Sequence, residues 1–371
     1  MKVLQIGKFY YPIMGGVETV AFDIAEILNQ KGIVCDILCT NINHKTVYDT
    51  INGYKVFRAG IFGDVFSTQL SLKYIILLRK IIDNYDILHV HLPNPLANIA
   101  IMLANIHNKK IVIHWHSDII KQKNILKLYR PFQSWLLNKA DVIIGTTQDY
   151  IENSQDLSAY QGKCVAIPIG IDPDRLRSDN ELIKQIRTKY ANKKIILSLG
   201  RHVYYKGLQY LIEAAKFLDE EYVILIGGEG PLTSELAHSI IANNVQNKVV
   251  LLGKIDRYEL GSYFAACDLF CLPSIMKSEA FGVVQIEAMS FGKPVIATKI
   301  DGSGTSWVNK HESSGINVDI MDPVQLADAI KKITGDKALY QQYSTSARQR
   351  FTEYFHREVM LNKIIDIYKS L

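Results

Sequence analysis

Two kinds of hydrophobic pattern alternate along the chain. Short runs that are almost wholly apolar are typical of strands buried on both faces of a parallel sheet. Longer amphipathic stretches separate these runs and predict helices that cover the sheet. In the first half, the predicted strands lie near residues 2–6, 34–39, 86–91, 110–114 and 141–145.

The same alternation begins again after the polar stretch 172–180. The second series of strands is expected near residues 194–199, 222–226, 248–252, 269–272 and 294–297. Since 371 residues are many for one core, we predict an α/β protein with two doubly wound, Rossmann-like parallel-sheet domains. Such sheets bind ligands beyond the carboxyl ends of their strands, so the residues that follow each strand are the candidates for a site.

The segment after the strand near 269–272 predicts a loop that turns into a helix at about Ala280. The backbone amides of Phe281, Gly282 and Val283 are then expected at the helix N-terminus. Unpaired N–H groups and the helix dipole favour an anion there.

Two glutamates, Glu279 and Glu287, flank these amides. A carboxylate at each end of an anion site suits a diphosphate that carries a polyol on both sides. The simpler alternative is an N-capping Glu279 and a solvated Glu287 on a surface helix.

Two cations, Arg201 and Lys206, follow the strand near 194–199. A basic loop on its own is usually solvated. Opposite a helix N-terminus and two carboxylates, however, the pair suits a diphosphate, because arginine grips phosphate oxygens bidentately and lysine adds a mobile charge.

Glycines follow one strand in each half at positions where a backbone can approach a ligand. Gly15 and Gly16 open the first predicted helix, and Gly228 follows the strand near 222–226. Neither the Gly-x-Gly-x-x-Gly fingerprint after the first strand nor a Gly-Lys-Ser/Thr sequence is present. Their absence argues against a nicotinamide enzyme and against a P-loop NTPase.

Two His-x-His pairs, His89/His91 and His114/His116, lie in or at the end of predicted buried strands. Residues i and i+2 share one face of a strand, which permits a zinc interpretation. We favour instead one core histidine and one cleft histidine in each pair, with His116 facing the reacting centre.

Other metal-like patterns have structural interpretations. The five cysteines, at positions 35, 39, 164, 267 and 271, lie mostly in apolar strand-like contexts and are expected to be reduced thiols. Asp172 and Asp174 form an Asp-x-Asp string, but Pro173 between them favours a turn.

A net charge of +5 is too small to indicate nucleic acid by itself. The stretch 119–139 is basic and amphipathic, without an acidic residue between Asp118 and Asp141. It suits an anionic membrane surface, or else an ordinary core-facing helix with a solvated basic face. No apolar run approaches the roughly 20 residues of a membrane span, and the chain starts at once with a strand-like run, so a cytoplasmic protein without a signal peptide is expected.

Six motifs in order resemble the family-four retaining nucleotide-sugar glycosyltransferases with the GT-B fold, in particular bacterial O-antigen and surface-polysaccharide mannosyltransferases. The resemblance covers nearly the whole chain. The motifs are Gly15-Gly16-Val17-Glu18, His116, Gly170-Ile171-Asp172, Gly200-Arg201 with Lys206-Gly207, Gly228-Glu229-Gly230-Pro231 and the run from Glu279 to Glu287. One departure is Ser306, which stands where many relatives have a glutamate.

The resemblance implies an acceptor-binding domain over 1–172, a donor-binding domain over 173–353 and a helix over 354–371 that crosses back to the first domain, with the two domains facing a cleft. It assigns Arg201 and Lys206 to the diphosphate leaving group, Glu279 to the donor sugar, Glu287 to the ribose and His116 to the reacting centre. The remaining implied donor-binding residues are Gly15, Gly16, Gly228, Phe281, Gly282 and Val283.

The implied reaction is the metal-independent, cofactor-free transfer of a hexose, with GDP-mannose as the first choice of donor. The acceptor is a glycan hydroxyl, carried on a polyprenyl diphosphate at the inner membrane surface and contacted through 119–139. A UDP-sugar transferase of the same fold, a nucleotide-sugar epimerase and a non-catalytic sensor remain alternatives. Front-face attack is preferred, because only Asp118 and Glu18 are available, by default, as a carboxylate nucleophile.

Overall fold

The computed structural model describes residues 1–65, 68–118 and 123–371, which form two compact units. Unit 1 comprises residues 1–170 and 357–371, and unit 2 comprises residues 171–356. The last helix, α14 (Arg357–Ser370), therefore folds with unit 1. The divisions expected from the sequence lie after residues 172 and 353.

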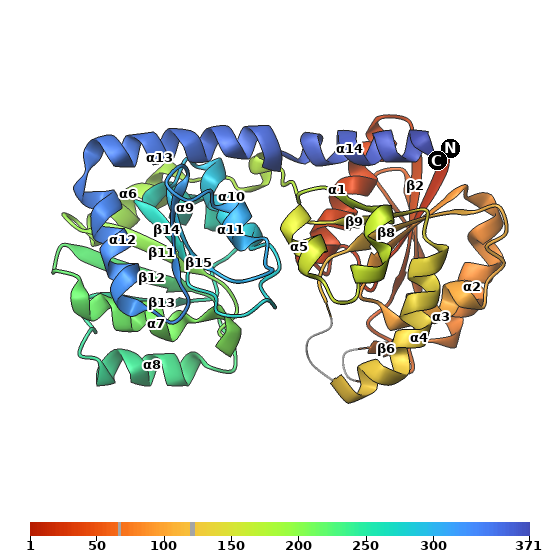
Figure 1. The fold of residues 1–371 in the computed structure, drawn as a ribbon, viewed down its shortest axis with the longest axis horizontal. Coiled ribbons are helices and arrows are strands. Elements are labelled where there is room, and N and C mark those ends of the chain that lie inside the picture. The colour runs from red at the N-terminus through yellow and green to blue at the C-terminus, as the bar shows by residue number, and fades with distance from the viewer. Residues whose placement is uncertain (66–67, 119–122) are drawn as a thin grey trace. The chain divides into compact units, whose positions relative to one another are not determined.

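Unit 1 is built on an eight-stranded sheet with the order β10-β9-β8-β7-β1-β2-β4-β3 (Figure 1). Its neighbouring strands are parallel except for β3 and β4, which are antiparallel. The strands are β1 (Lys2–Ile6), β2 (Val34–Thr40), β3 (Val47–Ile51), β4 (Tyr54–Ala59), β7 (Ile87–Leu92), β8 (Lys110–Trp115), β9 (Val142–Gly145) and β10 (Cys164–Ala166). The strands β5 (Gly63–Val65) and β6 (Thr68–Leu70) form a separate antiparallel pair.

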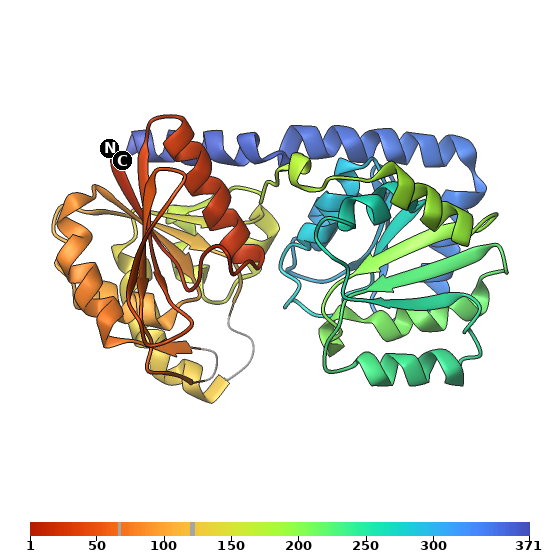
Figure 2. The same ribbon diagram turned by 180° about the vertical axis from the view of Figure 1, so that it is seen from behind.

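Helices cover this sheet. Helix α3 contacts α2 and α4, whereas α1 contacts α14, as the two opposite views show (Figures 1 and 2). Besides α14, the α-helices of unit 1 are α1 (Gly16–Gln30), α2 (Leu72–Ile81), α3 (Pro95–Met102), α4 (Lys123–Lys139) and α5 (Gln148–Asn153).

Unit 2 is built on a six-stranded parallel sheet with the order β13-β12-β11-β14-β15-β16. This is the order of dinucleotide-binding doubly wound sheets, in which ligands bind where the strand order reverses, here between β11 and β14. The strands are β11 (Lys194–Leu199), β12 (Tyr222–Gly227), β13 (Val249–Gly253), β14 (Leu269–Leu272), β15 (Val295–Lys299) and β16 (Gly315–Asp319).

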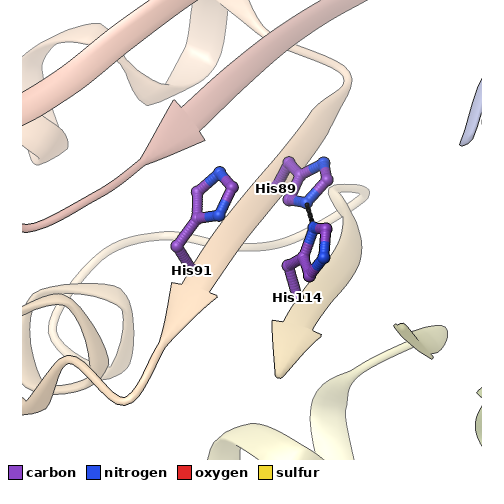
Figure 3. A group of neighbouring side chains, drawn as sticks. All are labelled: His89, His91 and His114. Carbon is purple, nitrogen blue, oxygen red and sulfur yellow. Dashed lines mark hydrogen bonds between the residues drawn. The ribbon is translucent and has the colours of Figure 1, made fainter. Parts of the chain in front are cut away.

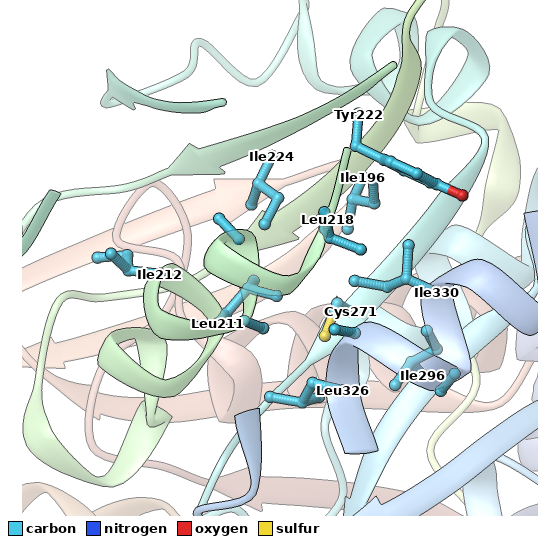
Figure 4. Close-up of a cluster of buried hydrophobic side chains, with 14 of the residues drawn as sticks. Ile196, Leu211, Ile212, Leu218, Tyr222, Ile224, Cys271, Ile296, Leu326 and Ile330 are labelled. Atoms are coloured by element: carbon cyan, nitrogen blue, oxygen red, sulfur yellow. The ribbon is translucent and has the colours of Figure 1, made fainter. Parts of the chain in front are cut away.

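A core of aliphatic side chains holds the unit 2 sheet against its helices. Ile196, Ile224 and Ile296 project from the sheet toward Leu211 on α7 and Ile330 on α12 (Figure 4). The helices are α6 (Asn180–Lys189), α7 (Leu208–Ala214), α8 (Thr233–Ala242), α9 (Leu260–Ala266), α10 (Val283–Ser290), α11 (Thr305–Val308), α12 (Pro323–Gly335) and α13 (Lys337–Arg350).

All ten strands predicted from the sequence are present, and the two-domain α/β prediction is confirmed. The antiparallel β3/β4 hairpin was not predicted, because β3 is a partly exposed edge strand without a continuous apolar run. Its turn is nevertheless an Asn-Gly pair, Asn52 and Gly53, with φ of 46° and 94°. Asn-Gly is a strong hairpin signal, since both central residues of the favoured turn need positive φ.

Candidate functional site

The candidate site in unit 2 lies at the carboxyl ends of β11 and β14, where the strand order reverses. The loop after β11 carries Arg201 and Lys206, and the loop after β14 carries Glu279. The two loops approach closely at Gly207, whose φ is +64° and whose position leaves no room for a side chain. A Cβ there would lie 2.0 Å from the carbonyl oxygen of Pro273.

Lys206 and Glu279 form an ion pair at this point. The Lys206 Nζ lies 2.5 Å from Glu279 Oε2, and both side chains are nearly buried, at 12% and 10% exposed. The Ser274 hydroxyl donates a second hydrogen bond to Glu279 Oε2 at 2.9 Å. From the sequence, the two residues are expected to bind different parts of a ligand, and the structure brings them into direct contact.

Helix α10 begins at Val283, so the predicted start at Ala280 is wrong by three residues. The reason is Gly282, the N-cap residue, whose φ of +75° lies in the left-handed region and cannot belong to an α-helix. Two hydrogen bonds hold the loop that precedes α10. The Ser303 hydroxyl donates to the Glu279 carbonyl, and the Gly304 amide donates to the Ala280 carbonyl at 2.8 Å.

The backbone amides of Phe281, Gly282 and Val283 nevertheless lie at the N-terminus of α10. Within residues 1–65, 68–118 and 123–371, none of the three donates a hydrogen bond to the chain. Phe281 and Gly282 are buried. Buried N–H groups without a partner are rare in folded proteins, so this end of α10 is ready to receive an acceptor group.

Glu287, on α10, is half-buried. Burial raises the pKa of its carboxyl group to about 7, although the nearby positive charges of Arg257 and Lys206 oppose this shift. Arg257 was not identified from the sequence. Its signal is its position just after β13, the same kind of position that identified Arg201 after β11.

Arg201 is exposed at the end of β11, whereas its neighbour His202 is buried. The His202 Nδ1 lies 2.9 Å from the Thr233 hydroxyl oxygen. Gly228 has φ of +123°, and a Cβ there would lie 2.0 Å from the carbonyl oxygen of Gly200. In the structure Gly228 therefore lets the loops after β11 and β12 pack together.

In unit 1, the predicted glycines Gly15 and Gly16 lie at the start of α1. Gly15 is the N-cap residue and Gly16 is the first residue of α1. A Cβ on Gly16 would meet nothing within 4 Å. Packing within the described chain therefore does not require glycine at this position, which leaves room above the backbone for a ligand.

The histidines His89 and His91 on β7, His114 on β8 and His116 just after β8 are all buried, with exposed fractions from 0% to 8%. Figure 3 shows three of them, His89 and His91 on one strand and His114 on its neighbour. The prediction of one cleft histidine per pair is therefore wrong for His91, which is 2% exposed. Only His116 lies beyond the end of its strand, where its amide donates to the Leu92 carbonyl at 3.0 Å.

Three of these histidines are close enough to share a metal ion. Each of His89, His91 and His114 offers a ring nitrogen, and the three nitrogens lie within 4.8 Å of one another. Hydrogen bonds already use several ring nitrogens, including one of 3.3 Å between His89 Nε2 and His114 Nδ1. The sequence prediction that no metal is needed remains a prediction.

Asp118, one of the two default nucleophile candidates, is held by its surroundings. Its Oδ1 accepts hydrogen bonds from the Trp115 indole at 3.0 Å and from the Ser154 hydroxyl at 2.7 Å. For the other candidate, Glu18, burial raises the pKa, so its ionised form is disfavoured. Neither environment is that of an activated nucleophile.

Three other features predicted from the sequence are the cysteines, the Asp-x-Asp string and the basic segment. The five cysteines are free thiols, four of them buried. The Asp172 carboxylate accepts from the Asp174 amide at 3.1 Å and caps a short helical turn, as expected for a structural Asp-x-Asp. Residues 119–122 of the predicted membrane segment lie outside the described residues, and the described part, from Lys123, is helix α4.

Two family models together match most of the chain. "Glycosyltransferase Family 4" matches residues 14–175, and "Glycosyl transferases group 1" matches residues 179–350. The O-antigen chain mannosyltransferase C of Escherichia coli is 30% identical over 100% of this chain and 99% of its own length. The chain belongs to the family-four glycosyltransferases.

This glycosyltransferase is also 30% identical to the D-rhamnosyltransferase WbpZ of Pseudomonas aeruginosa, over 96% of this chain and 92% of WbpZ. Among solved structures, Anabaena HepE in complex with UDP superposes with a TM-score of 0.79 at 20% identity, and each chain is fully covered. The GT-B fold is thereby confirmed. Within its described residues, no helix combines the length and apolarity needed to span a membrane.

Proposed function

We propose that this glycosyltransferase transfers a hexose with retention, using GDP-mannose as donor and a hydroxyl of a lipid-linked glycan as acceptor. The product belongs to a bacterial surface polysaccharide, an O-antigen or a capsule. The two relatives at 30% identity support the choice, since one is an O-antigen mannosyltransferase and the other a rhamnosyltransferase.

The observation that carries the proposal is the set of three unpaired amides at the N-terminus of α10. They follow closely after Glu279, which pairs with the Lys206 ammonium group. A diphosphate satisfies both, since N–H groups at a helix N-terminus and a lysine each favour phosphate oxygens. Glu279 and Glu287 then bind hydroxyl groups on either side, of the sugar and of the ribose respectively.

Charge compensation drives the proposed chemistry. As the glycosidic bond breaks, negative charge develops on the diphosphate, and Lys206, Arg201 and the amides of α10 stabilise it. The leaving phosphate oxygen accepts the proton of the acceptor hydroxyl, which attacks the same face of the sugar. His116 contacts the donor sugar from unit 1, as the resemblance implies. In this scheme the cationic side chains take the place of a divalent metal ion.

We also propose that unit 1 meets the cytoplasmic face of the membrane through residues 119–139. The described part of this segment supports the idea, because Arg130 and Phe132 of α4 are both exposed. A basic and apolar helix is suited to an anionic lipid surface. A polyprenyl diphosphate acceptor would be presented there.

The test is the thermal shift of the protein with GDP-, UDP-, dTDP- and ADP-sugars, repeated with Lys206→Ala and Glu287→Ala. We expect stabilisation by GDP-mannose that both substitutions abolish, followed by mannose transfer to a polyprenyl-linked glycan. Stabilisation by UDP-sugars alone would refute GDP-mannose and favour the alternative of a UDP-sugar transferase, which the UDP complex of HepE supports at the level of the fold. Conversion of a nucleotide sugar without any acceptor would favour an epimerase.

A further inference from the structure

A hydrogen-bonded chain of three side chains runs through the interior of unit 1 and ends at His116. Gln5 Oε1 lies 2.7 Å from His91 Nε2, and His91 Nδ1 lies 3.0 Å from His116 Nε2. Gln5 is on β1, His91 on β7 and His116 just beyond β8. All three are buried, at 1%, 2% and 8% exposed. We call Gln5, His91 and His116 the Gln5 relay.

The orientation of the Gln5 amide follows from its other contacts. Its nitrogen lies 3.0 Å from the Ala21 carbonyl oxygen and 3.3 Å from Cys35 Sγ. A carbonyl oxygen only accepts hydrogen bonds, so the NH₂ group of Gln5 must face Ala21. The opposite atom, Oε1, therefore faces His91 as an acceptor.

This orientation fixes the protons of both histidines in turn. His91 must donate from Nε2 to the Gln5 oxygen. Burial and the neighbouring histidines lower the pKa of His91 and of His116 well below the usual value, so both rings are neutral. A neutral imidazole carries one proton, so His91 Nδ1 accepts and His116 Nε2 donates. His116 Nδ1 is then left without a proton.

The far end of the relay is open. Among the described residues, His116 Nδ1 has no hydrogen-bond partner. The atom is not fully buried, so solvent or a ligand can reach it. The ring itself is held in place by stacking on His114, with centroids 4.3 Å apart and planes 8° apart. The relay therefore presents one fixed, unprotonated nitrogen at the carboxyl edge of the sheet.

We propose that Gln5 sets the tautomer of His116, so that Nδ1 is a hydrogen-bond acceptor that selects donor sugars with a hydroxyl group at the contacted position. This rests on the proposed function, in which His116 contacts the donor sugar. Gln5 and His91 are positioning residues, because they act only through His116. The acceptor nitrogen binds an O–H group and repels a phosphate oxygen, which has no proton to give.

The relay also explains why His116 stays uncharged near the reacting sugar. Protonation of Nδ1 would place a positive charge in a buried ring beside three other histidines, which burial disfavours. The lone pair of the neutral ring stabilises the positive charge that develops on the sugar, whereas the positive charge of an imidazolium would repel it. The same tautomer thus serves both recognition and catalysis.

The structure offers a matched control on the same sheet. A second chain runs from Tyr368 on α14 to His89 and on to His114, through a hydrogen bond between the Tyr368 hydroxyl and His89 Nδ1. In the described part of unit 1, this second chain makes no hydrogen bond to Gln5, His91 or His116 and contacts the histidines by ring stacking. Tyr368→Phe removes a buried hydrogen bond of the same kind and leaves the Gln5 relay intact.

The first experiment measures the tautomers directly, by ¹⁵N NMR of the histidine rings in the ligand-free full-length protein, with His116→Gln used for assignment. We expect a pyridine-like Nδ1 and a pyrrole-like Nε2 for His116 in the wild type and in Tyr368→Phe. In Gln5→Glu the carboxylate favours a doubly protonated His91, whose Nδ1 then donates, so the His116 pattern should reverse. Gln5→Leu, which removes the acceptor, should give a mixture. A pyrrole-like Nδ1 in the wild type, or an unchanged pattern in Gln5→Glu, overturns the proposal.

The second experiment compares the affinities for GDP-mannose and for GDP. In Gln5→Glu and Gln5→Leu we expect affinity for GDP-mannose to fall about tenfold, as for the loss of one buried hydrogen bond, while affinity for GDP stays unchanged. Tyr368→Phe should change neither. An equal loss for GDP and GDP-mannose would show a merely structural role and overturn the proposal. If no GDP-, UDP-, dTDP- or ADP-sugar binds the wild type, the proposed function fails, and the selection of sugars by His116 fails with it. The NMR experiment needs no ligand, so it still tests whether Gln5 sets the tautomer of His116.

Discussion

The Lys206–Glu279 ion pair makes two functional residues depend on each other for stability. Removal of one partner leaves a nearly buried charge uncompensated, so we expect Lys206→Met to lower the free energy of unfolding by about 2–4 kcal/mol. In the double variant Lys206→Met/Glu279→Leu no charge is left unpaired, and most of this loss should be recovered. Urea denaturation of the three proteins measures both effects.

Activity should separate from stability in the same series. The double variant is expected to regain stability but to transfer sugar at least ~100-fold more slowly than the wild type, because the charge that stabilises the leaving diphosphate is gone. Additive destabilisation in the double variant would show that the two charges are not coupled. Near wild-type turnover would remove Lys206 from the proposed mechanism.

The raised pKa of Glu287 predicts that the stability of the folded protein depends on pH. Its folded-state pKa of about 7 exceeds the usual value of 4.5, so between these values the folded protein binds the extra proton. Stability is therefore lost as the pH rises from about 4.5 to 7 and stays lower above this range. Glu287→Gln should remove the loss and stabilise the protein by about 1–2 kcal/mol at pH 8, a figure reduced for the partial exposure of the side chain.

Denaturant unfolding of wild type and Glu287→Gln at pH 5 and pH 8 checks this prediction. The stabilisation should be small at pH 5 and reach its full size at pH 8, while affinity for the nucleoside diphosphate falls. Glu181→Gln, at an exposed position in the first turn of α6, is the control and should show no such dependence. A stabilisation of equal size at both pH values would refute ionisation as its cause.

At the scale of the element, the turn into α10 depends on the backbone of one residue. An alanine Cβ at Gly282 would lie 2.7 Å from both Gln285 Nε2 and Leu272 Cδ2, in a left-handed conformation. We expect Gly282→Ala to cost about 1–2 kcal/mol of stability and to weaken nucleotide binding, because the three free amides must shift. Gly335→Ala is the matched control, since a Cβ there meets nothing within 4 Å.

Thermal unfolding with and without GDP tests both parts of this prediction. A lower unfolding temperature together with a smaller GDP-induced shift is expected for Gly282→Ala, and neither for Gly335→Ala. If Gly282→Ala keeps the full GDP shift, the N-terminus of α10 is not the diphosphate site.

The buried strands could be predicted because burial on both faces leaves a continuous apolar run, as in the fully buried β12. The edge strand β3 lacks this run. The turn at Gly282 also leaves no hydrophobic pattern, so the left-handed conformation that delays the start of α10 was not visible in the sequence. The candidate site was predictable as a set of residues that follow strands. The contacts within the site were not predictable. The pairing of Lys206 with Glu279 and the position of Arg257 near Glu287 depend on how segments far apart in the sequence meet in space.

Two neighbouring helices of unit 1, α3 and α4, carry exposed apolar and basic side chains. Phe132 on α4 is 40% exposed and Leu103, which ends α3, is 55% exposed, and α3 contacts α4. The Arg130 side chain, also on α4, is 51% exposed, with a loose 3.9 Å contact to Asp156 among its described ion pairs. Apolar groups that enter the lipid boundary and cations that attract anionic headgroups act together at membrane surfaces.

We therefore expect charge reversal of Lys121, Lys123, Lys127 and Arg130 to glutamate to abolish sedimentation of the protein with anionic liposomes. Each basic residue near an anionic surface contributes about 1 kcal/mol, so four reversals should lower the affinity by at least ~100-fold. The control reverses Lys184, Lys189, Lys216 and Lys337, which are exposed on unit 2 and give the same change in net charge. Equal loss in both variants would show that net charge alone draws the protein to the lipid. Unchanged sedimentation of the first variant would remove 119–139 from the proposed membrane contact.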